Sequence, residues 1–128
     1  MARLPRPCIS QGQGGRRHIM VKVIALCPRR KDMSREDFEK YLRETHVPLL
    51  VKMPGLRRLV LNLARPDPNL PEPAYDMVGE DWFDDAQVMG AAFASAEGIA
   101  VVEDAPNFLD MDRFVLLVTE EEDIPLPT

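Results

Sequence analysis

Two short segments near opposite ends of the chain are apolar at every position, and this feature constrains the fold more than any other. Residues 23–27 read Val-Ile-Ala-Leu-Cys, and residues 114–118 read Phe-Val-Leu-Leu-Val. Successive side chains of a β-strand point to opposite faces of its sheet. Strands that are apolar on both faces are normally covered on both faces. The sequence therefore predicts one sheet whose two faces both need cover.

The segments between these two strands follow helical and strand periodicities in turn. Ser34 can cap a first helix, in which apolar side chains recur at helical spacing until Pro48 interrupts it. Asp84 is placed to cap a second helix, and a proline-rich loop separates two middle strands. The predicted elements follow the order β-α-β-β-α-β, at residues 20–27, 34–49, 56–65, 75–83, 85–96 and 113–119, with a short extra helix at 97–105.

This order is that of a ferredoxin-like α+β sandwich. We expect its two helices to cover one face of the sheet, and its first and last strands to pair at the centre. If the second face stayed exposed to water, the fold would lose several kcal/mol of stabilisation, at about 25 cal/mol per Å² of exposed apolar area. A second copy of the chain is the simplest cover, so the sequence predicts a homodimer that forms a dimeric α/β barrel. Loops that cover this face within a monomer are the alternative.

Length and composition fit one domain, which we expect to cover residues 20–128. Residues 1–19 lack periodicity and are rich in Gly, Pro, Gln and Arg, so we interpret them as a disordered extension. The net charge of −5 argues against nucleic-acid binding, and no apolar run is near the roughly 18 residues that span a membrane. Two cysteines imply no disulfide framework, and we expect a cytoplasmic protein.

Motifs that bind cofactors are missing from the sequence. It contains no metal-ligand spacing of His and Cys, no Gly-rich phosphate loop, no nucleophile elbow and no dinucleotide fingerprint. We therefore expect no metal and no tightly held cofactor. Any ligand is expected to be a small, largely apolar molecule.

His46 is the only histidine of the predicted domain, and it lies two residues before Pro48, where the first helix is interrupted. An imidazole titrates near neutral pH, so this position suits proton transfer. The structural alternative is a histidine that hydrogen-bonds the carbonyl groups left free at the helix break. The residues alone do not decide between these two roles.

Strand alternation places four further polar or aromatic side chains on one face of the sheet. If the leucines of residues 56–65 pack on the helices, Arg58 and Asn62 face the other way. The alternation of the next strand sends Glu80 and Trp82 to that same side. A carboxylate beside an indole in an apolar cleft could have a raised pKa and act as acid or base. Alternatively, Glu80 pairs with an arginine such as Arg58.

The predicted domain resembles the EthD family, within the dimeric α/β-barrel superfamily, from residue 20 to about residue 121. The motifs that carry the resemblance include Met33-Ser-Arg-Glu-Asp-Phe38, Tyr41-Leu-Arg-Glu-Thr-His-Val-Pro-Leu49, Met53-Pro-Gly-Leu-Arg57, Gly79-Glu-Asp-Trp-Phe-Asp84 and Leu117-Val-Thr-Glu-Glu121. The sequence departs from the family at residues 1–18 and at Asp81, where an apolar residue is usual and the strand pattern also expects a leucine.

This resemblance implies a homodimeric barrel with a hydrophobic cleft in each subunit. The family's relatives include proteins tied to ether degradation, and cyclase-, dehydratase- or decarboxylase-like enzymes of aromatic polyketide pathways. The family's histidine and glutamate correspond to His46 and Glu80 in this sequence. The resemblance therefore implies that both side chains line a ligand cleft.

Three classes of function remain open from the sequence. The first is a cofactor-independent enzyme that acts on a small hydrophobic aromatic or polyketide-like compound, with His46 as general acid/base and Glu80 as its partner. The second is a non-catalytic protein that binds such a compound in the same cleft, and haem binding is a third. The side chains expected to bind the substrate are Tyr41, Arg58, Asn62 and Trp82.

Overall fold

The structure, a computed structural model that describes residues 20–128, contains one antiparallel sheet and a layer of helices. Its elements are β1 (Val21–Cys27), α1 (Arg35–Tyr41), the π-helical turn η2 (Leu42–His46), α2 (Val47–Leu50), β2 (Arg58–Leu63), β3 (Met77–Phe83), α3 (Ala86–Ala94), α4 (Ala96–Asp104), the 3₁₀ turn η3 (Ala105–Asn107) and β4 (Val115–Glu120). This is the predicted β-α-β-β-α-β order, so the ferredoxin-like α+β fold is confirmed. The extension predicted at residues 1–19 lies outside the described residues.

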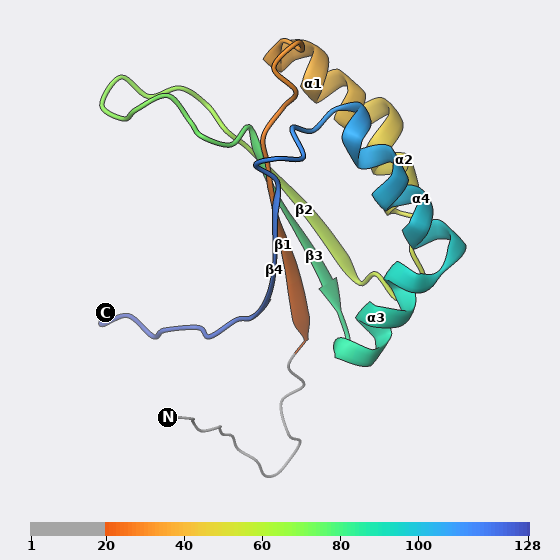
Figure 1. Ribbon diagram of the computed structural model, residues 1–128. Helices are drawn as coiled ribbons and strands as arrows, with labels where there is room; N and C mark the ends of the chain where they lie inside the picture. The colour runs from red at the N-terminus through yellow and green to blue at the C-terminus, as the bar shows by residue number, and fades with distance from the viewer. Residues whose placement is uncertain (1–19) are drawn as a thin grey trace.

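The strands lie in the order β2-β3-β1-β4, and the helices cover one face of the sheet (Figure 1). The sequence predicted that the first and last strands pair at the centre. They do pair, but β4 is an edge strand, and the two central strands are β1 and β3. The connection through α1 and α2 joins β1 to β2 across β3. The connection through α3 and α4 joins β3 to β4 across β1, so the two β-α-β units interleave.

The core fills the space between the sheet and the helices. Its fully buried side chains include Phe38, Phe83 and Phe108, which come from α1, from β3 and from the segment after η3. The leucines of β2 pack against the same apolar clusters, as their alternation predicted. Truncation of such a buried phenylalanine to alanine costs about 3–5 kcal/mol.

No helix formed by residues 20–128 lies over the opposite face of the sheet. Leu117 of β4 points to this face beside Ile24 of β1, and it is 46% exposed. Leu116 and Val118 point towards the helical side, yet at the edge of the sheet they are still 51% and 60% exposed. The last strand, apolar on both faces, is therefore open on one face and only partly covered on the other.

Side chains cap the first turns of three helices, α1, α3 and α4, and Ser95 caps the last of these by accepting from the Gly98 N–H at 3.0 Å. Ser34 accepts a hydrogen bond from the Asp37 N–H at 3.0 Å, as predicted. Asp85 caps α3 by accepting from the Val88 N–H at 2.8 Å, so the prediction that Asp84 is the cap is wrong by one residue. The reason is that α3 begins at Ala86, so Asp84 and Asp85 both lie in the turn after β3 and Asp85 takes the capping position. No helix within residues 20–128 is long and apolar enough to cross a membrane.

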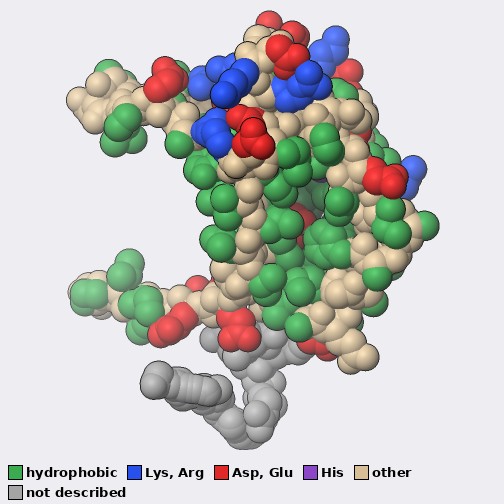
Figure 2. Space-filling model, viewed as in Figure 1, with side chains coloured by type: hydrophobic (Ala, Val, Ile, Leu, Met, Phe, Trp, Pro, Cys, Tyr) green, Lys and Arg blue, Asp and Glu red, His purple; other side chains and the backbone are tan. Residues whose placement is uncertain are grey.

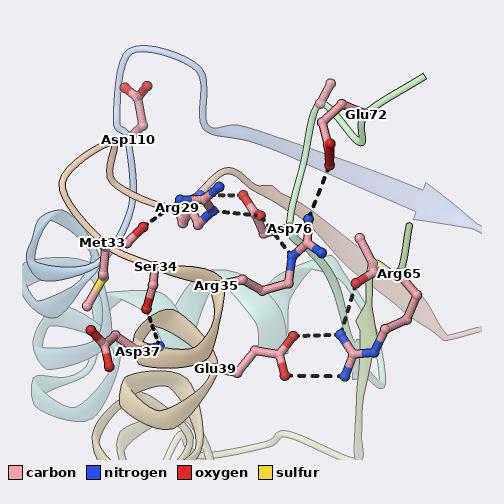
Figure 3. Close-up of polar contacts among 12 residues, drawn as sticks. Arg29, Met33, Ser34, Arg35, Asp37, Glu39, Arg65, Glu72, Asp76 and Asp110 are labelled. Carbon is pink, nitrogen blue, oxygen red and sulfur yellow. Dashed lines mark hydrogen bonds and ion pairs between the residues drawn. The ribbon is translucent and has the colours of Figure 1, made fainter. Parts of the chain in front are cut away.

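Ion pairs at one end of the sheet fix the position of α1. Asp76 accepts hydrogen bonds from the backbone N–H and from the Nε of Arg29, at 2.9 and 3.1 Å (Figure 3). Glu39 of α1 pairs with Arg65, whose Nη1 lies 2.6 Å from Oε2. Asp76 directly precedes β3 and Arg65 follows β2, so these contacts tie the start of the helical layer to the sheet.

Candidate functional site

Two small residues at the centre of the sheet create a cavity beneath the helices. Ala25 of β1 pairs with Gly79 of β3, and both line the space below the helical layer. Leu61 and Leu116 flank this pair on the two outer strands. A methyl group and a hydrogen atom at the centre of the row leave room below the helices, and a cavity of about 120 Å³ lies there.

The cavity opens at the edge of the sheet, between β4 and the helical layer. Figure 2 shows this hollow, with hydrophobic side chains over most of its visible wall and acidic atoms deep inside it. Its rim includes Val102, Met111 and Leu116, which are roughly half-exposed. Among the lining residues that the structure describes, Asp81 is the only acidic one and His46 the only basic one. A small apolar molecule in this cavity can therefore reach one acidic and one basic side chain.

His46 reaches the cavity from the helical layer. It is the last residue of η2, in which the Val47 N–H bonds the Leu42 carbonyl group five residues earlier. Such π-helical turns are rare and frequently occur at functional sites. The helix interruption predicted at Pro48 takes this form, because α2 restarts at Val47 with Pro48 in its first turn. The imidazole is 7% exposed and packs on Phe108, with ring centroids 4.6 Å apart.

Asp104 of α4 orients this histidine. Its Oδ2 lies 2.9 Å from the His46 Nδ1. Its Oδ1 accepts hydrogen bonds from the Tyr41 hydroxyl group at 2.5 Å and from the Asn107 amide at 3.1 Å. An ionised carboxylate can only accept, so it selects the tautomer with the proton on Nδ1. The Nε2 atom then keeps a lone pair that can take a proton.

Burial and hydrogen bonding set the protonation states of this pair. Burial lowers the pKa of His46, and the hydrogen bond and charge of Asp104 offset this effect only in part. Burial acts to raise the pKa of Asp104, but hydrogen bonds from Tyr41, His46 and Asn107 outweigh it, and the pKa is lowered. At neutral pH the pair is a neutral imidazole beside an ionised carboxylate, which is the arrangement of a general base.

Asp81 reaches the cavity from the sheet. It faces the helices from the central strand β3, between Leu59 of β2 and Val23 of β1. The residue is 8% exposed, and its carboxyl group has no hydrogen-bond or ion-pair partner among residues 20–128. Burial raises the pKa of Asp81 to about 6. Cys27, also in the cavity wall, stays a thiol because burial raises its pKa to about 12.

Four of the predicted site residues lie together on the opposite face of the sheet, where their alternation placed them. The Glu80 carboxylate accepts from the Lys22 ammonium group at 2.9 Å and from the Asn62 amide at 2.8 Å. The Arg58 guanidinium group stacks over the Trp82 ring, 4.5 Å from its centroid. These side chains form a charged patch on the uncovered face, separate from the cavity.

The expectation that Glu80 is the partner of His46 is therefore wrong. The sheet separates Glu80 from His46, and the carboxylate partner of the histidine is Asp104. Of the two alternatives for the Glu80 carboxylate, a raised pKa or an ion pair, the structure shows an ion pair, with Lys22 rather than Arg58, and the hydrogen bond from Lys22 lowers the pKa of Glu80. Strand alternation identifies side chains that share a face, but it does not show which face carries the cavity.

Tyr41 and His46 are the two predicted site residues that the structure brings together on the helical side of the sheet, because both bond Asp104. Sequence analysis missed Asp104, which is 58 residues from His46, so no local pattern connects the two. It also gave no role to Asp81, although an acid in an apolar alternation was a usable signal. Within the described part of the chain, no cluster of His, Cys, Asp and Glu could hold a metal ion.

Comparison with known proteins places this chain in a family. The family model of the EthD domain matches residues 30–112. The structure of an EthD family protein from Bacillus halodurans C-125 is 28% identical in sequence, with a TM-score of 0.66. That match covers 82% of this chain and 99% of the other. Among curated proteins, none matches this chain.

Two further solved structures share the fold and are described as dimeric. A ferredoxin-like protein of Thermobifida fusca YX is 16% identical, with a TM-score of 0.61 and coverage of 79% of this chain and 90% of that one. A protein of Bacteroides fragilis NCTC 9343 is 17% identical, with a TM-score of 0.57 and coverage of 81% and 96%. The family model spans more than half of the sequence, so the resemblance is confirmed and the chain belongs to the EthD family.

Proposed function

We propose that this protein binds a small aromatic or polyketide-like molecule in the cavity and catalyses a cofactor-independent proton transfer on it. The observation that carries the proposal is the His46–Asp104 pair in the wall of an apolar cavity, with Nδ1 2.9 Å from the carboxylate. Neutral His46 acts as general base through Nε2, and Asp104 holds its ring and its tautomer. The Tyr41 hydroxyl group donates a hydrogen bond to the other carboxylate oxygen of Asp104.

The cavity limits the size and the polarity of the ligand. Its volume of about 120 Å³ is close to that of an engineered apolar cavity, of about 150 Å³, that binds benzene. Phe93, Phe108 and Phe114 contribute aromatic surface to its wall. A compound with one aromatic ring, or a short part of a polyketide chain, suits this space. A haem macrocycle is much larger, so haem binding is not part of the proposal.

The proposal includes a homodimer that buries the uncovered face of the sheet. On that side, Figure 1 shows both the β2–β3 loop and the C-terminal segment projecting away from the helices. These two segments carry Leu70, Ile124 and Leu126, which are exposed by 68%, 66% and 81%. A second copy, packed sheet against sheet, would cover these side chains and Leu117. The dimeric structures of similar fold support this arrangement.

The charged patch would face the space between the two sheets of such a dimer. A substrate-binding role for Arg58, Asn62 and Trp82, and a catalytic role for Glu80, therefore stay predictions about that space. The proton transfer proposed for the cavity does not use them. Substitution of Glu80 by glutamine should accordingly leave that reaction unchanged.

Binding without catalysis is the second candidate function. The observation that favours it is the wall itself, in which every lining side chain except His46, Asp81 and the Cys27 thiol is apolar. Such a cavity can hold a hydrophobic metabolite without changing it. The two functions differ in whether His46 is needed for a reaction or only touches the ligand.

Hydrogen–deuterium exchange of acetophenone tests the proposal. In D₂O a general base replaces the methyl hydrogens beside the carbonyl group by deuterium, and proton NMR follows the loss of signal. We expect the protein to accelerate exchange over an equal concentration of imidazole, and His46→Gln to reduce the rate by about 10²–10⁴-fold. Binding of acetophenone without acceleration would favour the non-catalytic function. Failure of every one-ring compound to bind would contradict the assignment of the cavity.

A further inference from the structure

One buried titratable group of the cavity has no role in the proposed proton transfer. Asp81 faces the cavity from the middle of the sheet, is 8% exposed and has no hydrogen-bond or ion-pair partner within residues 20–128. Its carboxyl oxygens keep some accessible surface in the cavity, but a carboxyl group largely removed from water without a partner is still costly. A ligand that supplies the missing partner would remove that cost.

The groups that face Asp81 shift its equilibrium towards the neutral form, although with a pKa of about 6 that form predominates only below this pH. The neighbouring strands β2 and β4 contribute only apolar side chains to the cavity wall, as do α2 and α3. The titratable groups are the Cys27 thiol of β1 and His46 of η2, and neither carries a positive charge at neutral pH. The negative charge of Asp104 lies behind His46. Nothing in the wall stabilises an ionised Asp81, and burial raises its pKa.

We propose that Asp81, as a neutral carboxyl group, donates a hydrogen bond to a carbonyl oxygen of the ligand, so that the substrates of this cavity are small carbonyl compounds. This inference rests on the proposed function, because it names the substrate class of the same site. A neutral carboxyl group offers one O–H donor. Apolar surroundings raise the pKa of a carboxylic acid, and with a pKa of about 6 Asp81 is predominantly neutral, and able to donate, below pH 6.

The cavity places the two groups on different walls. A ligand that lies over Ala25 and Gly79 has the sheet with Asp81 on one side and the helical layer with His46 on the other. The carbonyl oxygen of the ligand can therefore meet Asp81 while the adjacent C–H bond meets the Nε2 of His46. This arrangement divides acid and base between the sheet and the helices.

The step is an enolisation in which atoms and charges balance. The C–H bond next to the carbonyl group breaks, its proton goes to Nε2, and its electron pair forms the C=C bond. The carbonyl π pair moves to oxygen, which takes the proton of Asp81. A ketone, a neutral imidazole and a neutral carboxyl group thus become an enol, an imidazolium and a carboxylate, and the reverse step restores all three. No other reactant is needed.

The affinities of two ligands of similar shape distinguish the hydrogen bond from Asp81 to the ligand from the burial of the ligand's apolar surface. Acetophenone has the carbonyl oxygen, and toluene does not. Asp81→Leu should weaken acetophenone binding by roughly 3- to 10-fold and leave toluene binding undiminished, because only one hydrogen bond is lost. Asp81→Asn keeps an N–H donor and should retain most of the preference for acetophenone. If Asp81→Leu does not fold, Asp81→Val takes its place.

Two spectroscopic and kinetic readouts accompany the binding series. The infrared carbonyl stretch of bound acetophenone should shift to lower frequency in the wild type and in Asp81→Asn, but not in Asp81→Leu. The exchange rate of the wild type should fall at high pH as Asp81 ionises in the complex. Asp81→Asn should lose that high-pH decrease and keep the low-pH decrease that comes from protonation of His46.

Three results would overturn the inference. An unshifted carbonyl stretch in the wild type, or an unchanged ratio of acetophenone to toluene affinity in Asp81→Leu, would show that Asp81 does not meet the oxygen. Tighter binding of benzylammonium than of acetophenone, lost in Asp81→Leu, would instead make Asp81 an ionised anchor for cations. In all three cases, exchange that still depends on His46 would leave the proposed function intact. If the exchange rate does not depend on His46, that result contradicts the proposed function, independently of Asp81.

Discussion

The carboxylate of Asp104 holds the imidazole of His46 from a position 58 residues away in the chain, with Oδ2 2.9 Å from Nδ1. The contact joins α4 to the turn at the end of the first helical segment. Tyr41 donates to the second oxygen of the same carboxylate. Because Asp104 takes the proton-bearing nitrogen, the nitrogen with the lone pair is left for a ligand.

Asp104→Asn should impair exchange of acetophenone far more than it impairs binding. An asparagine amide can donate to Nδ1 and so favour the opposite tautomer, which removes the lone pair from Nε2. We expect the exchange rate to fall by about 10²–10⁴-fold and toluene affinity to stay unchanged. Asn107→Ala, which removes a weaker bond to the same carboxylate, is the matched control and should have little effect. Full activity of Asp104→Asn would show that the tautomer does not matter.

Asp81→Leu should stabilise the folded protein, and the gain should grow as pH rises from about 4 to about 7. The folded-state pKa of about 6 lies above the unfolded value of 3.8, so the folded state holds a proton that the unfolded chain has already lost. Stability is therefore lost as pH rises through this window, by about 3 kcal/mol at about 1.36 kcal/mol per pH unit. Urea denaturation of both proteins across this range measures the difference. A difference that does not vary with pH would mean that Asp81 is not the buried acid described.

Gly79→Leu should fill the cavity and abolish binding of toluene. A Cβ atom at this position meets nothing closer than the Met77 sulfur at 3.4 Å, so the longer side chain has room only in the cavity. We expect no loss of thermal stability, because the new side chain fills an apolar space. Gly90→Leu is the control, since a Cβ there meets nothing within 4 Å. Toluene binding that survives in Gly79→Leu, measured by NMR titration, would place the ligand elsewhere.

Leu117→Asp should convert a dimer into a monomer. Leu117 lies on the uncovered face of the sheet, where a second copy would bury it, and an unpaired buried charge is costly. Ile99→Asp places the same charge on a half-exposed position of α4, in the helical layer, and should leave the dimer intact. Light scattering measures both masses. A wild-type monomer at micromolar concentration would remove the argument for a barrel.

Much of the fold follows from local patterns that the sequence displays. Alternation along β2 predicts that its leucines face the helices, and they do. Ser34 predicts where the first helical segment begins, and Pro48 predicts where that segment is interrupted. Both predictions hold within the described residues. The edge position of β4 was not predicted, because strand order depends on how the two β-α-β units interleave.

The site was only partly predictable because its parts come together through pairing and packing. The cavity exists because Ala25 and Gly79 are neighbours in register on different strands, and sequence alone does not give that register. The link between His46 and Asp104 depends on how α4 packs beside the first helical segment. Glu80 was assigned to the histidine because both were expected in one cleft, and the sheet between them shows that they are not.

A crystal structure with bromobenzene tests most directly whether the ligand site is the cavity between sheet and helices. Bromobenzene has one aromatic ring, and the anomalous scattering of bromine locates it without ambiguity. The account predicts a bromine peak inside the cavity, beside Gly79 and within contact of the His46 imidazole, in the wild type and not in Gly79→Leu. Bromine on the uncovered face of the sheet, beside Trp82 and Glu80, with an empty cavity, would contradict it.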